Sequence, residues 1–142
     1  MVVRPVVILA LLAHAGAAEA QAPRCHRYER DTVVLSGRVE RRVYPGRPNY
    51  ESVRAGDEPD TVYVLRLNAP LCTTATQEFE ARAGVRDVQL YFAREDAAGV
   101  RALRGRSATL RGTLTGAVWG WHHLPVLLEV RFPRARPGAP AA

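Results

Sequence analysis

The sequence predicts a mainly β fold with one short helix, and three observations lead to this expectation. The chain has 142 residues, a length typical of one domain. Five short stretches are rich in apolar residues, and most of them alternate apolar and polar positions with the period of two that β-strands require. One stretch changes to a helical period, and two of the strand-like stretches carry a glycine near their middle, which favours a bend.

The first half of the chain contains three expected strands. Residues 32–43 alternate regularly and form the first. Residues 44–60 are rich in Pro, Gly, Asn and Asp, which is typical of a long connection. Residues 61–67 are apolar on both faces and form the second strand, which we expect Pro70 to end. Residues 87–92 form the third strand.

The second half supplies the helix and two more strands. Within residues 93–103, Ala97, Val100 and Leu103 are spaced for one face of a short helix, and Gly105 is a plausible stop. Residues 107–114 and 126–132 return to strand patterns.

Three strands, one helix and two strands is the order of a small five-stranded Greek-key barrel of the OB type. Gly37 and Gly112 would let two of its strands bend. Closing the sheet also removes the exposed edges that a small β protein must otherwise protect. We therefore expect an OB-like barrel with one short helix between strands three and four. A different small β-barrel or a sandwich is the alternative.

Residues 1–20 resemble a secretory signal peptide. Arg4 gives a positive start, residues 6–13 are apolar but too short to span a bilayer, and residues 18–20 (AEA) suit a cleavage site. A buried N-terminal helix is the alternative. We expect one domain over residues 21–132, a disordered tail over residues 133–142, and a periplasmic or secreted protein. We expect no transmembrane segment, because no apolar run reaches about 18 residues.

The two cysteines, Cys25 and Cys72, would both lie in the exported part of the chain. In an oxidising compartment, one Cys25–Cys72 disulfide is the economical interpretation. Two free thiols or two metal ligands are the alternatives, although the spacing lacks the CxxC pattern of redox and zinc sites.

The composition excludes some functions and disfavours others. All 20 basic residues are Arg, which rules out a Schiff-base lysine and a Walker-type phosphate loop. No GxSxG or HExxH motif is present, so we expect no enzyme activity and no cofactor. The net charge of +6 and the pI near 10.1 permit nucleic-acid binding, but dispersed arginines and export disfavour it. Weaker electrostatic attraction to anionic envelope polymers or lipid headgroups is another use of this charge.

Two unusual segments coincide with the loops that commonly carry ligands in OB barrels. They are residues 45–60 and residues 117–125 (AVWGWHHLP), which contain both Trp residues of the protein. We predict a non-catalytic module, expected to be a monomer, that binds an unknown envelope component or protein. The predicted binding residues are Asn49, Tyr50, Trp119, Trp121, His122 and His123. Tyr50 and the Trp pair would supply apolar contact area, and the others would orient polar groups.

Three other interpretations of the same segments stay open. The Trp residues could plug one end of the barrel while the histidines satisfy backbone groups. Alternatively, the protein could bind a metal through His122 and His123, with His26 or the acidic turn Asp57, Glu58 and Asp60 as further ligands. An uncharacterised enzyme is a third possibility.

Several segments together are similar to one protein family. They are Cys25, residues 28–29, 34–37, 45–53 (PGRPNYESV), 56–57, 63–72 (YVLRLNAPLC), 88–90, 112–114 and 122–128 (HHLPVLL). This set resembles the uncharacterised exported bacterial family called domain of unknown function 4431.

The resemblance implies an exported β domain with a paired cysteine and no established activity. Trp121 and Leu124 stand where the family often carries a His and a Thr. This difference weakens a metal or polar-catalytic role for the loop.

Overall fold

The computed structural model describes residues 24–132. The predicted signal peptide and the predicted tail lie outside the described residues. The strands are β1 (His26–Arg27), β2 (Thr32–Pro45), β3 (Pro59–Thr74), β4 (Arg82–Tyr91), β5 (Ser107–Gly116) and β6 (Val126–Val130). The helical elements are α1 (Ala97–Ala102) and the 3-10 turns η1 (Val53–Ala55) and η2 (Arg94–Asp96).

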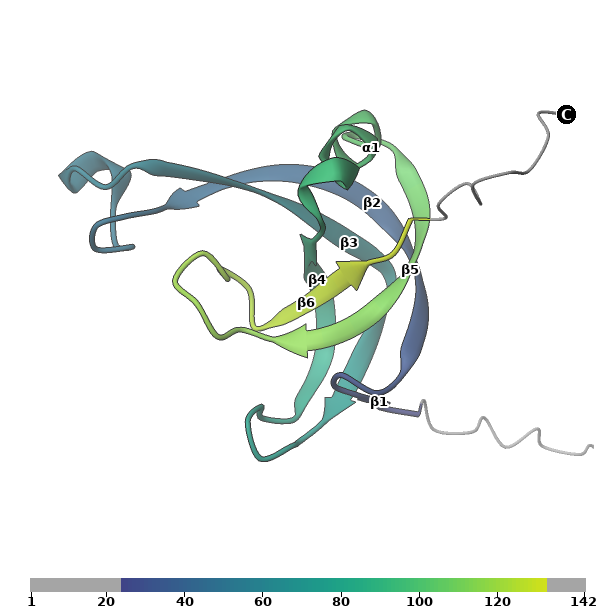
Figure 1. The fold of residues 1–142 in the computed structure, drawn as a ribbon. Coiled ribbons are helices and arrows are strands. Elements are labelled where there is room, and N and C mark those ends of the chain that lie inside the picture. The colour runs from purple at the N-terminus through teal and green to yellow at the C-terminus, as the bar shows by residue number, and fades with distance from the viewer. Residues whose placement is uncertain (1–23, 133–142) are drawn as a thin grey trace, which may run out of the picture.

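Strands β2 to β6 close into a five-stranded barrel (Figure 1). β2 pairs antiparallel with both β3 and β5, and β4 pairs antiparallel with β3. β6 pairs antiparallel with β5 and parallel with β4, which closes the barrel. The mainly β class, the closed barrel and the helix between the third and fourth barrel strands are as predicted. The strand order is compatible with the OB type.

The core follows from the alternation of the strands. Inward-facing residues such as Val39, Leu65, Val88, Leu114 and Leu128 are fully buried. Val100 of α1 is also fully buried and joins this core. Because one face of each strand is apolar, a slip of one residue would expose the whole set, so the pattern fixes the register.

Gly37 and Gly112 mark places where neighbouring strands approach too closely for a side chain. A Cβ at Gly37 would collide with the backbone carbonyl of Arg66 in β3. A Cβ at Gly112 would collide in the same way with the carbonyl of Glu129 in β6. The two central glycines seen in the sequence are therefore needed for the close packing of the barrel wall.

The prediction that Pro70 ends the second barrel strand was wrong. β3 continues to Thr74, and the pairing between β3 and β4 shifts register between Arg66 and Leu71. Pro70 lies inside this irregular stretch, where a missing N–H breaks no regular ladder. The third barrel strand likewise begins at Arg82, earlier than the predicted residue 87.

A disulfide joins Cys25 to Cys72, as predicted, and their Cα atoms are 4.6 Å apart. Next to it, the two-residue strand β1 pairs parallel with the end of β3. The start of the described chain is thus fixed to the barrel. Such a disulfide is compatible with an extracytoplasmic location. Within residues 24–132, no helix is long and apolar enough to cross a membrane.

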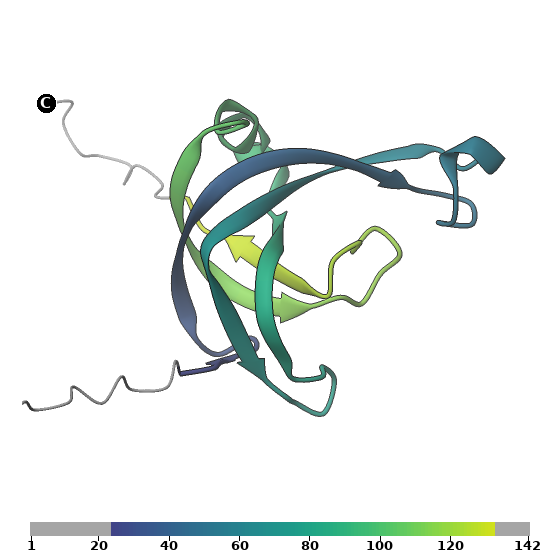
Figure 2. The ribbon, with the colours of Figure 1, turned by 180° about the vertical axis from the view of Figure 1, so that it is seen from behind.

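β2 and β3 extend beyond the barrel as a long hairpin. Its tip, residues 46–58, is called the hairpin loop here, and residues 117–125 between β5 and β6 are called the tryptophan loop. Both views show the two loops on the same side of the molecule (Figures 1 and 2). The barrel therefore brings together segments that are far apart in the sequence.

Candidate functional site

The tryptophan loop is organised by the ring of His122. Its Nδ1 atom accepts hydrogen bonds from the backbone N–H groups of Val118 (3.0 Å) and Trp119 (3.4 Å). The N–H of His122 in turn donates to the carbonyl of Trp119 at 2.8 Å. Burial of the ring, and then the nearby His123, lower the pKa of His122. The neutral ring is the form that accepts hydrogen bonds at Nδ1, so the low pKa and the turn support each other.

Gln89 of β4 fastens the tryptophan loop to the barrel wall. This side chain is buried, and its Oε1 accepts from the N–H groups of His123 (2.8 Å) and Leu124 (3.2 Å). Its Nε2 donates to the carbonyl of Trp121 at 2.9 Å. We did not predict this role. The available signal was an amide side chain between Val88 and Leu90 in a strand whose neighbours are buried.

Asp57 organises the hairpin loop in a similar way. Its buried carboxylate accepts from the backbone N–H groups of Asn49, Glu51 and Ser52 at 2.8 to 2.9 Å. The side-chain amide of Asn49 also donates to it, at 3.2 Å. The backbone donors of Ser52, Asn49 and Glu51 lower the pKa of Asp57, because they favour the charged form. Asn49, predicted as a binding residue, therefore has a partner inside its own loop.

His123 connects the tryptophan loop to the two strands that carry the hairpin loop. Its Nε2 lies 2.8 Å from Oδ2 of Asp60, and its side chain is only 8% exposed. Its ring stacks on Tyr44 with centroids 4.7 Å apart and an interplanar angle of 7°. Gly120 lies against the ring of Tyr50, where a Cβ would come within 2.7 Å of Cζ. The hairpin loop and the tryptophan loop are thus in direct contact.

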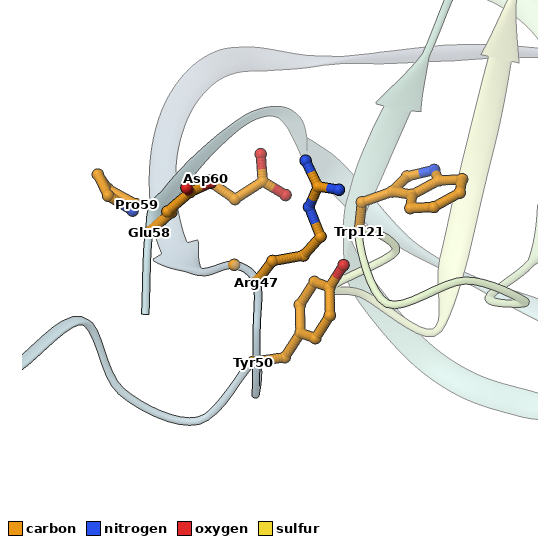
Figure 3. Close-up of a pocket in the computed structure, with 7 residues that line it drawn as sticks. Arg47, Tyr50, Glu58, Pro59, Asp60 and Trp121 are labelled. Carbon is orange, nitrogen blue, oxygen red and sulfur yellow. The ribbon is translucent and has the colours of Figure 1, made fainter. Parts of the chain in front are cut away.

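A cavity of about 400 Å³ lies where the loops meet, and it is called the rim cavity here. It is lined by Gly46, Arg47, Tyr50, Glu58, Pro59, Asp60 and Trp121. Figure 3 shows the guanidinium of Arg47 and the hydroxyl of Tyr50 reaching from the hairpin loop toward Trp121. Tyr50 and Trp121, two of the predicted binding residues, therefore share one cavity. Arg47 and the two carboxylates were not predicted as binding residues.

The two Trp residues lie on the surface. Their rings stack with centroids 5.5 Å apart, and Trp119 and Trp121 are 60% and 48% exposed. This exposure argues against the interpretation that they plug the barrel. Another aromatic pair packs on the core: buried Tyr28 contacts Phe79, with centroids 5.1 Å apart.

Strained backbone also occurs next to the tryptophan loop. Among residues 24–132, the residues other than glycine with positive φ are Glu29 (58°) and Tyr50 (60°). Tyr50 lines the rim cavity, and Glu29 lines another cavity that Trp121 also lines. Such conformations cost free energy and cluster at functional sites. Their position favours this region as the functional site of the molecule.

The histidines proposed as metal ligands have separate partners. His123 contacts Asp60, whereas His122 bonds to the backbone of its own loop. His26 lies in β1 opposite Thr73, near the end of β3, while Asp60 lies near its start. Within the described part of the chain, no group of three or more His, Cys, Asp or Glu side chains is arranged to hold a metal ion.

Comparison with known proteins agrees with the resemblance noted in the sequence. No curated protein and no solved structure matches the chain. Residues 87–133 match the family described as "Domain of unknown function (DUF4431)". The match includes Gln89, α1, β5, the whole tryptophan loop and β6. Over these residues the chain resembles a family whose description gives no activity.

Proposed function

We propose that this protein is an exported, non-catalytic binding module that recognises a component of the cell envelope through the tryptophan loop and the hairpin loop. The observation that carries the proposal is the exposed, stacked pair Trp119 and Trp121 beside the rim cavity. Large exposed aromatic rings next to a cavity with a few polar groups are typical of binding sites.

In this proposal the six predicted residues have two kinds of role, and two residues that were not predicted as binding residues, Arg47 and Asp60, join them. Tyr50, Trp119 and Trp121 contact the ligand, and Arg47 and Asp60 supply polar contacts in the rim cavity. Asn49, His122 and His123 hold the loops in place through their hydrogen bonds. Export is supported by the Cys25–Cys72 disulfide, since such bonds persist in oxidising compartments.

The proposal is tested by titrating the full chain, with its disulfide intact, with solubilised peptidoglycan fragments and with lipopolysaccharide. We expect the fluorescence of the two Trp residues to change on binding, and Trp121→Ala to weaken the binding about tenfold. Val34→Ala is the control, because Val34 is an exposed apolar residue of β2 that lies outside both loops and does not line the rim cavity. A chain that responds to neither fraction would contradict the proposal.

A further inference from the structure

Another cavity, called the outer cleft here, lies next to the tryptophan loop. Its volume is about 470 Å³. It is formed between the tryptophan loop, the outward-facing side chains of β5 and β6, and the segment that leads into β2. Trp121 lines both this cleft and the rim cavity. One elongated ligand that crosses Trp121 would therefore occupy both.

One wall of the outer cleft is aromatic. Trp119 stacks on Trp121, and Trp121 contacts the ring of His122 edge-on, with centroids 5.9 Å apart. His122 contacts Tyr91 of β4 edge-on at 6.0 Å. Tyr91, Trp121 and Trp119 are each about half exposed or more. With His122, these three rings form a continuous aromatic row that is largely exposed to solvent.

Apart from Val118, the remaining lining is polar, and its charges balance. Arg30 and Arg131 oppose Glu29 and Glu129, so the formal charge of these four residues is zero. Hydroxyl groups come from Thr32, Thr113 and Thr115, and Thr115 already donates to Glu29 at 3.2 Å. The rim cavity adds one Arg and two carboxylates. The net charge of +6 is therefore not concentrated where the aromatic rings are.

This balance distinguishes between two ligand classes. Barrels of the OB type bind oligonucleotides and oligosaccharides through the corresponding loops. A polyanion needs an excess of positive charge in its groove, because phosphate contacts supply most of its affinity. A sugar has an apolar ring face that packs on aromatic rings and hydroxyls that both donate and accept hydrogen bonds. The outer cleft offers the second combination.

We infer that the envelope component is an uncharged oligosaccharide, with one sugar ring packed on the Trp119–Trp121 wall of the outer cleft and the next units crossing Trp121 into the rim cavity. Thr113, Glu129 and Arg131 hydrogen-bond to the sugar hydroxyls from the barrel surface. This inference rests on the proposed binding role and adds to it the ligand class and the second cleft.

The test measures binding by calorimetry and by Trp fluorescence. The probes are the neutral tetrasaccharides of N-acetylglucosamine and of glucose, with heparin as a sulfated, polyanionic comparison. We expect at least one neutral tetrasaccharide to bind with a dissociation constant below about 1 mM. Because the cleft carries no net charge, we expect this constant to change less than about twofold between low and high salt.

Variants assign the binding to the outer cleft. Trp119 lines this cleft and not the rim cavity, so Trp119→Ala should weaken binding of the tetrasaccharide about tenfold, while Trp119→Phe retains most of it. Thr113→Val should weaken binding severalfold through the lost hydroxyl. Thr109→Val is its matched control, since Thr109 lies on β5 outside the cleft.

The outcomes separate the proposed binding role from the inference that the ligand is an uncharged oligosaccharide. If neither neutral sugar binds while lipopolysaccharide or peptide-bearing peptidoglycan fragments do, the oligosaccharide inference fails and the binding role stands. If only heparin binds and salt abolishes the binding, the oligosaccharide inference and the proposed recognition of an envelope component both fail. If no envelope fraction and no probe binds, both fail. Neutral sugar binding that Trp119→Ala leaves unchanged would overturn the assignment to the outer cleft.

Discussion

The imidazole of His123 lies 2.8 Å from the carboxylate of Asp60, although 63 positions separate the two residues in the sequence. This contact joins the tryptophan loop to the start of β3 at the base of the hairpin loop. Tyr44 covers one face of the same imidazole. The relative position of the two loops thus depends on a polar pair in which the imidazole is nearly buried and the carboxylate is 33% exposed.

Replacing Asp60 tests this connection. Asp60→Ala should lower the free energy of unfolding by about 1–3 kcal/mol, because His123 keeps its position but loses its partner. Urea unfolding at neutral pH measures the effect. Glu80→Ala is the control: it breaks an ion pair with Arg82 in which Glu80 is 81% exposed, and should cost less than about 1 kcal/mol. Equal losses in the two variants would show that the His123 contact is no stronger than an exposed pair.

Gln89→Leu should release the tryptophan loop while leaving the barrel closed. The change leaves two backbone N–H groups and one carbonyl without their partner, at a cost of about 1–3 kcal/mol for each group that water does not reach. Amide hydrogen exchange should become faster at His123 and Leu124, but not at Leu65 in the core. Unchanged protection of His123 and Leu124 would mean that the loop is held by other contacts.

The lowered pKa of Asp57 predicts how the free energy of unfolding depends on pH. Its folded-state pKa is lowered by the backbone donors of the hairpin loop, so the stabilisation is fully present above the unfolded pKa of about 3.9. It is lost as the pH falls through the lower folded value. The stability difference between the native chain and Asp57→Asn should therefore be constant near neutral pH and shrink below about pH 4. Urea unfolding across this range measures it, and a difference that does not change with acid would contradict the role of the carboxylate.

Gly120→Ala should push the two loops apart. The new methyl group would lie 2.7 Å from Cζ of Tyr50, so the ring or one of the loops must move, at a cost of about 1–3 kcal/mol where the packing holds the ring in place. In a Tyr50→Ala background the same change should cost much less, because the ring is gone. A double-mutant cycle by chemical unfolding measures this coupling. Additive losses would indicate that the loops do not contact each other in solution.

Removing the disulfide should destabilise the fold substantially. The bond closes a loop with a sequence separation of 47, and replacing both Cys25 and Cys72 by Ser should cost about 4 kcal/mol on the chain-entropy estimate. Thermal unfolding of the oxidised chain and of the double-Ser variant measures the loss. If the two proteins unfold at the same temperature, the disulfide does not stabilise the fold by restricting the conformations of the unfolded chain.

The fold followed from the sequence because alternation of apolar residues fixes both the strands and their buried faces. Gly37 and Gly112 further indicated where the strands bend, and the structure places a neighbouring carbonyl at each. Two features gave no such signal. β1 has only two residues and pairs through its backbone, and Pro70 sits in a stretch where the pairing of β3 and β4 is irregular.

The candidate site was predicted less completely. The sequence indicated the two loops and their aromatic residues, and the barrel order indicated that they would approach each other. The sequence left open whether the two histidines orient a ligand or satisfy backbone groups, and His122 does the latter. It did not indicate the partners of Asn49 and His123, since a polar side chain has the same pattern in the sequence whether it bonds to a ligand or to a distant carboxylate. Gln89 was missed because its function depends on β4 lying beside β6, a pairing between segments separated by the helix.

The attachment of the tryptophan loop to Gln89 has a consequence for affinity. The loop that carries both indole rings is hydrogen-bonded to β4 of the barrel, so it is already ordered before a ligand binds. The loop therefore loses most of its conformational entropy during folding, and binding of a ligand would cost little more. If the proposed binding role holds, modest contacts with a polar ligand are therefore enough to give measurable affinity.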